Sequence, residues 1–286
     1  MTNSSAPEVL RYSAFTADPA GGNPAGVVLD ASGLDDARQL AIAAELGYSE
    51  TAFLTRSPVQ PRTYAVQYFS PKAEVPFCGH ATVAAAVALA ERIGPGELLF
   101  ETKAGPVPVE VAEGGGGVLR ATLTSVAPAV EPVAEEDLAE ALAALGWSRS
   151  ELDGSLPPRI AYAGARHLVL AAATRERLAD LAYDFEGLTA LMLRLDLTTL
   201  QLVFRRSATE FDVRDPFPVG GVVEDPATGA AAAAFGAYLR ELEGLEAARL
   251  TLHQGQDMGR PGVLGVELLA EDRRVRVSGE AVAVPQ

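Results

Sequence analysis

The feature that most constrains the fold of this chain is a short pattern that occurs twice, 150 residues apart. Residues 74–81 read EVPFCGHA and residues 224–231 read EDPATGAA, so that Glu, Pro, Gly and Ala recur at matching places. The register holds through the alanine-rich run that follows each copy. Because alanine is common in this chain, alanine matches between the two copies can arise by chance. The argument for a repeat therefore depends on the matching Glu, Pro and Gly. Two copies of a glycine-to-helix junction predict a duplicated architecture with a site between the halves.

The chain length of 286 residues fits one large domain or two of ordinary size, and the repeat favours two. We expect a first domain of residues 1–125 plus about 270–286, and a second domain of residues 126–269. The proline-containing segment 127–135 is the expected linker. The last strand is expected to cross back to the first domain, because duplicated folds often exchange terminal strands.

The formal charge of -15 argues against nucleic acid and anionic membranes as partners, since phosphate groups would repel such a surface. No apolar stretch approaches the roughly 20 residues needed to span a bilayer. The opening sequence MTNSSAPEV lacks the basic start and apolar centre of a signal peptide. These features predict a cytoplasmic protein with a frayed N-terminal tail.

Cysteine and histidine usage gives no sign of a metal site. Cys78 is the single cysteine, which excludes an intrachain disulfide and agrees with a reducing compartment. The three histidines (His80, His167 and His253) lie far apart in sequence, with no zinc-type spacing near the cysteine. The sequence therefore predicts no metal.

Strand-like and helix-like segments alternate along the chain, which predicts an α/β fold. Expected helices are 34–46, 81–93, 135–145, 175–181, 187–195 and 230–242, and expected strands are 8–15, 25–29, 51–54, 63–69, 97–102, 107–111, 118–125, 167–171, 200–205, 250–253, 263–269 and 274–278. The helices after each repeat are alanine-rich around most of their circumference. Such helices are normally buried, so we expect each domain to wrap a curved sheet around a central helix. Good helix formers at a high alanine content are the alternative explanation.

Each repeat places glycine, Gly79 or Gly229, at the opening of a helix. First-turn N–H groups lack partners within a helix, and the helix dipole is positive there, so each junction is a candidate anion site. Helix starts that face one cleft would grip a carboxylate from both sides. The alternative is that both glycines only supply backbone freedom at a helix entry.

Several blocks, in order along nearly the whole chain, resemble the phenazine-biosynthesis PhzF-like family. They are Ser13-Ala14-Phe15-Thr16, Gly22-Asn23-Pro24-Ala25-Gly26-Val27-Val28, Leu46-Gly47-Tyr48-Ser49-Glu50-Thr51-Ala52-Phe53, residues 74–82, Gly221 to Gly229, and Gln254 with Gly259-Arg260-Pro261. Each block is modest evidence alone, and the ordered set is highly specific.

The resemblance implies the diaminopimelate-epimerase-like fold, in which two similar α/β domains are related by a pseudo-twofold axis. It also implies isomerase chemistry without metal or organic cofactor, in a homodimer. In the phenazine enzyme, the family's glutamate shuttles a proton between carbons of a cyclohexadiene acid. Glu50 matches that glutamate, and Ser49 beside it matches a substrate-binding position.

Moving a proton from carbon to carbon requires one group that accepts the proton and returns it. A carboxyl in a partly apolar cleft can have its pKa raised towards neutrality and do both. Glu50 follows an expected helix end and precedes an apolar strand, so its surroundings suit this task. The alternative is a structural hydrogen bond made by Glu50 at a strand entrance.

His80 and Asp225 carry over as a supporting pair, each near the start of one central helix. Imidazole and carboxylate groups there can bind the substrate or orient Glu50, so the three are expected to line one cleft between the domains. Asn23 matches a family position near the site. A structural histidine and a turn asparagine that supports Pro24 are the alternatives.

The chain departs from its relatives at two places. Ala230 stands where the family commonly has serine, so a hydroxyl is missing although the backbone N–H remains; this puts the particular phenazine substrate in doubt. The related epimerases use two cysteines, whereas Cys78 has Thr228 at its repeat-equivalent position. A two-thiol racemase mechanism is therefore disfavoured. Cys78 is either a buried packing residue or a thiol of lowered pKa at a helix start.

The sequence thus predicts a cofactor-independent isomerase of a small carboxylate-bearing metabolite. Glu50, His80 and Asp225 would be catalytic, and Asn23, Ser49, Gly79, Gly229 and Ala230 would bind the substrate. The alternative is a non-catalytic metabolite-binding or interaction protein that keeps the fold.

Overall fold

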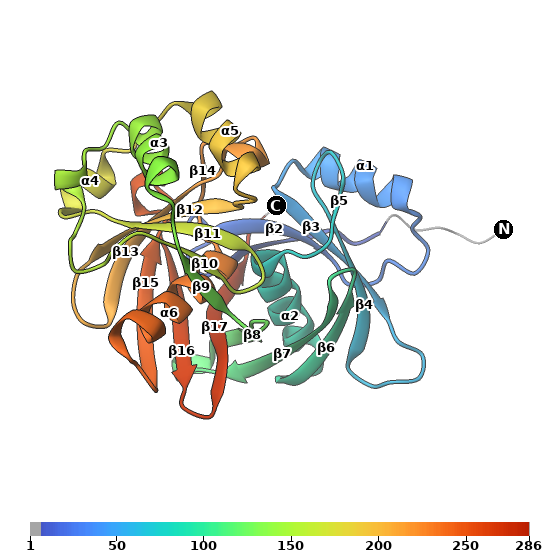
Figure 1. Cartoon of the computed structure of the whole chain (residues 1–286). Helices are drawn as coiled ribbons and strands as arrows, with labels where there is room; N and C mark the ends of the chain where they lie inside the picture. The colour runs from blue at the N-terminus through green and yellow to red at the C-terminus, as the bar shows by residue number, and fades with distance from the viewer. Residues whose placement is uncertain (1–6, 286) are drawn as a thin grey trace. The chain divides into compact units, whose positions relative to one another are not determined.

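The chain divides into two compact α/β units in the computed structural model, which describes residues 7–285 (Figure 1). Unit 1 runs up to Thr124 and resumes at Ser278, and unit 2 is Ser125–Val277. The frayed tail expected at the N-terminus lies outside the described residues. The expectation of two similar α/β domains is confirmed.

Unit 1 contains eight complete strands and two α-helices among its described residues. The strands are β1 (Leu10–Ala14), β2 (Asn23–Val28), β3 (Glu50–Arg56), β4 (Thr63–Phe69), β5 (Glu74–Val75), β6 (Gly96–Thr102), β7 (Gly105–Glu113) and β8 (Leu119–Thr124). The helices are α1 (Asp36–Leu46) and α2 (Gly79–Ile93), with a short 3-10 turn η1 (Gly115–Gly117).

Unit 2 repeats this order with additional helices. Its strands are β9 (Ala129–Pro132), β10 (Arg159–Tyr162), β11 (Arg166–Ala171), β12 (Thr199–Arg205), β13 (Glu210–Pro216), β14 (Glu224–Asp225), β15 (Ala248–Gln254) and β16 (Gly262–Leu269). Its helices are α3 (Glu135–Leu145), α4 (Arg175–Ala179), α5 (Phe185–Arg194) and α6 (Gly229–Glu243), and its 3-10 turns are η2 (Arg149–Glu151), η3 (Pro218–Gly220) and η4 (Gln256–Met258). The long β17 (Asp272–Ala283) begins in unit 2 and ends in unit 1, where it pairs with β1.

The two units share one strand connectivity. In unit 1, β2 is antiparallel to β1 and parallel to β3, and β4 pairs with β3, β5 and β6. In unit 2, β11 is antiparallel to β10 and parallel to β12, and β13 pairs with β12, β14 and β15. The antiparallel hairpin β6–β7 of unit 1 corresponds to the hairpin β15–β16 of unit 2. The repeat seen in the sequence is therefore a repeat of the whole fold.

A 15-residue helix lies at the centre of each unit, and the starts of α2 and α6 are 150 residues apart. In unit 1, α2 packs against β1, β2, β3, β7 and β8 (Figure 1). Every residue from His80 to Ala90 is buried. In unit 2, α6 packs against β9, β10, β11, β12 and β16. Small side chains permit this close approach of helix and strands.

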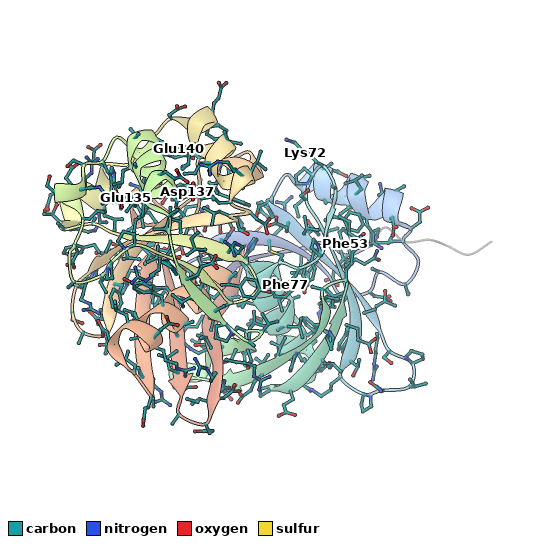
Figure 2. The ribbon with its side chains drawn as sticks, in the orientation of Figure 1. Phe53, Lys72, Phe77, Glu135, Asp137 and Glu140 are labelled. Atoms are coloured by element: carbon teal, nitrogen blue, oxygen red, sulfur yellow. The ribbon has the colours of Figure 1, made fainter. Side chains whose placement is uncertain are left out.

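The outer face of each sheet is covered differently in the two units. In unit 1, α1 covers it, and its Ile42 and Ala43 pack with the T-shaped ring pair Phe53–Phe69. In unit 2, α3, α4 and α5 enclose a larger leucine-rich core around Trp147. Figure 2 labels the acidic residues Glu135, Asp137 and Glu140 of α3, of which Asp137 and Glu140 accept hydrogen bonds from Arg194 of α5.

Five strands were not expected from the sequence, and two of them, β5 and β14, are only two residues long. The linker segment contains β9, which pairs with β10, a strand that the sequence patterns did not indicate. β13 was also missed, because its buried charges interrupt the apolar alternation of a strand. Two of these buried charges form ion pairs, Asp212 with Arg206 and Arg214 with Glu224, and the third, Asp215, accepts a hydrogen bond from Thr199. Among the described residues, no helix combines the length and apolar character needed to cross a membrane.

Candidate active site

Glu50 is the first residue of β3, where the chain leaves α1. Gly47 ends α1 in the left-handed conformation, with φ of 74°, and three residues later the chain runs parallel to β2. The turn after α1 thus places Glu50 at the beginning of β3, in register with Ala25 of β2. Its side chain is 18% exposed and therefore partly accessible to a ligand.

The start of α2 brings Cys78 and His80 to this carboxyl. The Cys78 thiol donates to Glu50 Oε2 across 3.5 Å, and His80 Nε2 lies 3.4 Å from the same oxygen. Both side chains are buried. Cys78 precedes the helix in extended conformation and makes no capping bond with its thiol, which leaves the sulfur directed at its neighbours.

Asn23 fixes the orientation of the His80 ring. Its side-chain Nδ2 lies 3.2 Å from His80 Nδ1, and the residue is buried at the start of β2. Gly22 before it has φ of 56°, and a Cβ there would lie 2.2 Å from Ala14 O, so glycine is required for this turn. When Nδ1 accepts from Asn23, the neutral imidazole carries its proton on Nε2, which faces Glu50 and lies 3.3 Å from Ser49 Oγ.

Burial raises the pKa of Glu50 above its ordinary value, while hydrogen bonds from Ser49 and Cys78 act in the opposite direction. Desolvation is the largest of these effects, so the shift is upward. This is the direction that the sequence predicted for a carboxyl that takes and returns a proton. Glu50 therefore has the environment of a candidate acid/base.

Glu50 and its two neighbours from the start of α2 form a candidate donor set for a metal ion. One ligand atom each from Glu50, Cys78 and His80 lies within 4.8 Å of the others. Sequence spacing did not indicate such a set, because Glu50 joins it through strand pairing and not through a local motif. The thiol, which the sequence left between a packing and a reactive role, contacts the candidate acid/base directly.

In unit 2, Asp225 is held beside the start of α6. Thr228 Oγ1 donates to Asp225 Oδ2 across 2.6 Å, and Gln254 Nε2 donates to the Asp225 carbonyl across 2.8 Å. Gln254 also accepts from the Thr228 N–H at 2.9 Å. The buried Gln254 thereby ties β15 to β14, which carries Asp225, and to Thr228 before α6. Sequence reasoning placed Gln254 in a family block but assigned it no role.

A buried polar chain lies behind Asp225, and no sequence pattern indicated it. Thr199 Oγ1 donates to Asp215 Oδ1 across 3.0 Å, so His167 Nδ1, 2.8 Å from that hydroxyl, must donate to it. Complete burial lowers the pKa of His167 to about 3, which keeps the ring neutral. Burial, and then the charge of Asp225 opposite it in the strand pair, hold the pKa of Asp215 well above its ordinary value.

The described structure brings together the predicted residues within each unit. Glu50, His80, Asn23, Ser49 and Gly79 surround the start of α2, and Asp225, Gly229 and Ala230 lie at the start of α6. In both helices the first intrahelical bond is donated by the residue three after the glycine. The N–H groups before it have no partner within the helix. The shared cleft remains a prediction.

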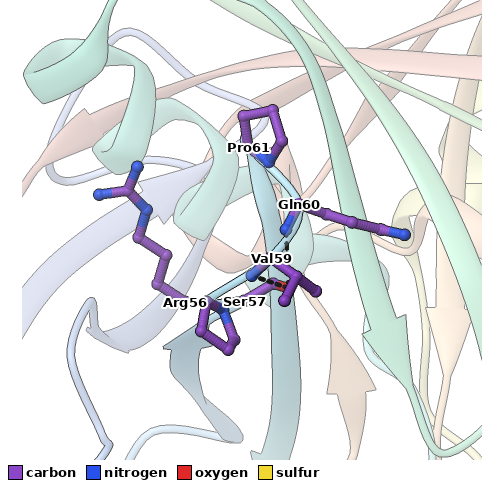
Figure 3. Close-up of a pocket in the computed structure, with 6 residues that line it drawn as sticks. Arg56, Ser57, Val59, Gln60 and Pro61 are labelled. Atoms are coloured by element: carbon purple, nitrogen blue, oxygen red, sulfur yellow. Dashed lines mark hydrogen bonds between the residues drawn. The ribbon is translucent and has the colours of Figure 1, made fainter.

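A pocket near Glu50 in sequence is unrelated to this cluster. Residues Arg56, Ser57, Pro58, Val59, Gln60 and Pro61 form it at the β3–β4 turn (Figure 3). Glu50 begins β3 and Arg56 ends it, which separates them by roughly 20 Å along an extended strand. The Ser57 hydroxyl accepts from the Val59 and Gln60 N–H groups, so this is a self-contained turn.

Comparison with known proteins gives consistent results over nearly the full chain. An uncharacterized isomerase of Escherichia coli (strain K12), YddE, is 34% identical over 286 residues, covering 96% of each chain. A trans-2,3-dihydro-3-hydroxyanthranilate isomerase of Pseudomonas fluorescens is 30% identical over 275 residues, covering 94% of each chain.

Solved structures agree with these sequence relatives. The crystal structure of a Bacillus anthracis phenazine biosynthesis protein of the PhzF family matches with a TM-score of 0.86 at 27% identity. That match covers 97% of this chain and 98% of the other. The family model described as phenazine biosynthesis-like protein matches residues 12–286. The chain therefore belongs to the phenazine biosynthesis-like protein family.

Proposed function

We propose that this protein is an isomerase that moves a proton between two carbon atoms of a small carboxylate-bearing metabolite. The observation that carries the proposal is the Glu50 carboxyl, whose pKa is raised by burial although its side chain stays partly exposed. A single carboxyl of this kind can take a proton from one carbon and return it to another. The isomerase names of the relatives support the same class.

In this mechanism, Glu50 is the acid/base and the groups around it maintain its geometry. The His80 Nε2–H faces Glu50 Oε2 at 3.4 Å, so it can stabilise the carboxylate that forms when Glu50 gives up its proton. Asn23 keeps the imidazole in that orientation. Ser49, exposed and 3.3 Å from the same ring nitrogen, can exchange this contact for one to the substrate.

Asp225 and the two helix starts would hold the substrate. The N–H groups around Gly79 in α2, and around Gly229 and Ala230 in α6, suit a carboxylate because the helix dipole is positive at these points. Asp225 would accept a hydrogen bond from a hydroxyl or amino group of the substrate. The proposal requires both helix starts to bind one substrate molecule.

The chemistry proposed here needs neither a metal ion nor an organic cofactor, because one carboxyl performs both proton transfers. We also propose a cytoplasmic homodimer with no nucleic-acid or membrane partner. The net charge of -15 supports the exclusion of polyanionic partners. Sedimentation equilibrium over a range of concentrations tests the dimer, and a monomer at all concentrations contradicts it.

Solvent-proton exchange tests the function while the substrate is still unidentified. The protein is incubated in D₂O with a panel of small unsaturated and hydroxylated carboxylic acids, and deuterium incorporation at carbon is followed by NMR. The panel includes trans-2,3-dihydro-3-hydroxyanthranilate, which the Pseudomonas fluorescens relative is named for. Because Ala230 lacks a hydroxyl, we expect a different acid of the panel to exchange faster.

Two variants make the exchange test specific. Glu50→Gln keeps the shape of the site and removes the proton carrier, so exchange should stop while binding of the same acid persists. Glu97→Gln, at an exposed carboxyl of β6, is the matched control and should exchange like the wild type. Tight binding of an acid by the wild type with no exchange in any sample would instead identify the non-catalytic binding protein.

A further inference from the structure

We infer that Glu50, Cys78 and His80 form a Zn²⁺ site whose occupation shuts off the proposed proton transfer. The three donor atoms come from two elements of unit 1, the start of β3 and the start of α2. Their chemistry is that of zinc ligands, since zinc takes thiolate sulfur, imidazole nitrogen and carboxylate oxygen. Hard cations such as Mg²⁺ prefer oxygen ligands and are not expected to bind here.

The distances between the donor atoms already match one face of a zinc tetrahedron. Zinc–ligand bonds of about 2.0–2.3 Å at tetrahedral angles put neighbouring ligand atoms about 3.3–3.6 Å apart. Glu50 Oε2 lies 3.5 Å from Cys78 Sγ and 3.4 Å from His80 Nε2. Cys78 Sγ lies 3.8 Å from His80 Nε2, so a small rotation of thiol or ring completes the face. Little reorganisation is therefore required.

The residues around the triangle suit a bound metal. His80 Nε2 must lose its proton to bind zinc, so the neutral ring then carries its proton on Nδ1. The carboxamide of Asn23, 3.2 Å away, can accept from Nδ1–H by turning its oxygen towards the ring. Zinc displaces the thiol proton of Cys78 to solvent, and the partial exposure of Glu50 leaves a fourth position for water.

Inhibition follows from the double use of Glu50, and this part of the inference rests on the proposed function. An oxygen lone pair that is bound to zinc cannot accept a proton from a carbon atom. The bound ion would also occupy the space in which the substrate carbon must approach Glu50. Zinc and turnover are therefore mutually exclusive at this site, and a chelator should restore activity.

Cobalt(II) titration of the metal-stripped protein tests the site without any assay of activity. Because Cys78 is the only cysteine in the chain, a sulfur-to-cobalt charge-transfer band can arise only from this residue. We expect the band at one equivalent of Co²⁺, its removal by Zn²⁺, and no effect of excess Mg²⁺. Cys78→Ser should abolish the band and weaken Zn²⁺ binding, measured by competition with a chromophoric chelator, at least about 100-fold.

Matched variants separate this site from other metal binding. Glu50→Gln should keep a sulfur-to-cobalt band but bind Zn²⁺ about 10–100-fold more weakly. His253→Gln, on β15 of unit 2, should bind like the wild type. Absence of the band in the wild type, or unchanged Zn²⁺ affinity in Cys78→Ser, overturns the inference.

Inhibition is measured in each protein as the ratio of its exchange rate with Zn²⁺ to its own rate without Zn²⁺. Zn²⁺ should reduce the deuterium exchange rate of the wild type, and the half-inhibiting concentration should rise at least about 100-fold in Cys78→Ser relative to its own zinc-free rate. A cobalt band with no exchange of any acid refutes the proposed function and leaves the metal site standing. Deuterium exchange of an acid in a protein that gives no cobalt band refutes the metal site and leaves the proposed function standing.

Discussion

The starts of the two central helices have the same backbone and different chemistry. Strand register makes Glu50 of β3 the counterpart of Thr199 of β12, since each begins a seven-residue strand parallel to its predecessor. The repeat pairs Cys78 with Thr228 and His80 with Ala230. In unit 1 this position therefore holds a carboxyl, a thiol and an imidazole, and in unit 2 it holds two hydroxyls and a methyl group.

The difference shows how a duplicated fold can specialise. The backbone supplies a glycine-initiated buried helix in both units, which is a general device for receiving anions. Unit 1 adds a titratable group on a partly exposed side chain, which suits proton transfer. Unit 2 instead surrounds Asp225 with hydrogen bonds that hold it in place. We interpret unit 1 as the reactive half and unit 2 as the binding half.

The largest effect should come from exchanging the reactive group of unit 1. Glu50→Gln should lower kcat by about 10²–10⁴, because the only proton carrier is lost while the side-chain shape remains. Thr199→Ser keeps the hydroxyl at the equivalent place in unit 2, and its kcat should stay within tenfold of the wild type. Steady-state rates for an acid found in the exchange screen measure both. Equal losses in the two variants would contradict the division of roles.

A large difference in stability should come from the repeated glutamates. Glu224 forms a buried ion pair with Arg214, whose Nε lies 2.9 Å from Glu224 Oε1. Glu224→Gln should lower the free energy of unfolding by about 3–5 kcal/mol, because the Arg214 charge stays buried without its partner.

The matched change in unit 1 is Glu74→Gln, which removes a pair with the exposed Lys103. No resolvable loss is expected there, because solvent screens the pair. Urea unfolding followed by circular dichroism compares the two variants. A Glu74→Gln loss as large as that of Glu224→Gln would show that burial does not distinguish these pairs.

A pH-dependent effect should come from Asp215, whose pKa burial raises and the charges of Asp225 and Glu224 raise further. The folded state thus binds a proton that the unfolded state has lost, and stability falls as pH rises from about 4 through the folded pKa. Asp215→Asn removes this loss. Its Tm should exceed that of the wild type at pH 7, and the difference should vanish near pH 3. A lower Tm of the variant at pH 7 would contradict the raised pKa of Asp215.

The smallest effect concerns the two central helices at their equivalent positions 86 and 236. Ala86→Gly should lower the free energy of unfolding by about 1 kcal/mol through helix propensity. Gly236→Ala should not give the opposite gain, because a Cβ there would lie 2.7 Å from Val266 Cγ1. Urea unfolding measures both. A stabilisation near 1 kcal/mol in Gly236→Ala would mean that the sheet around α6 gives way easily.

The sequence alone determined the duplication and the central helices, and it predicted candidate site residues in both units. Glycine, proline and charge placement are local signals, so helix ends such as Gly47 and helix starts such as Gly79 could be predicted from neighbouring residues. The ordered family blocks then identified Glu50, His80 and Asp225 as candidates. Their pairing with specific neighbours could not be predicted in the same way.

Only the tertiary structure decided which side chains meet. The contact of Cys78 with Glu50 depends on β3 lying beside the start of α2, and the buried chain His167–Thr199–Asp215 depends on the register of three strands. The strand β13 was missed because its buried charges resemble a surface segment until Arg206 and Glu224 are seen beside them. Such contacts join residues far apart in sequence, and no local pattern records them because their energy arises only when the chain is folded.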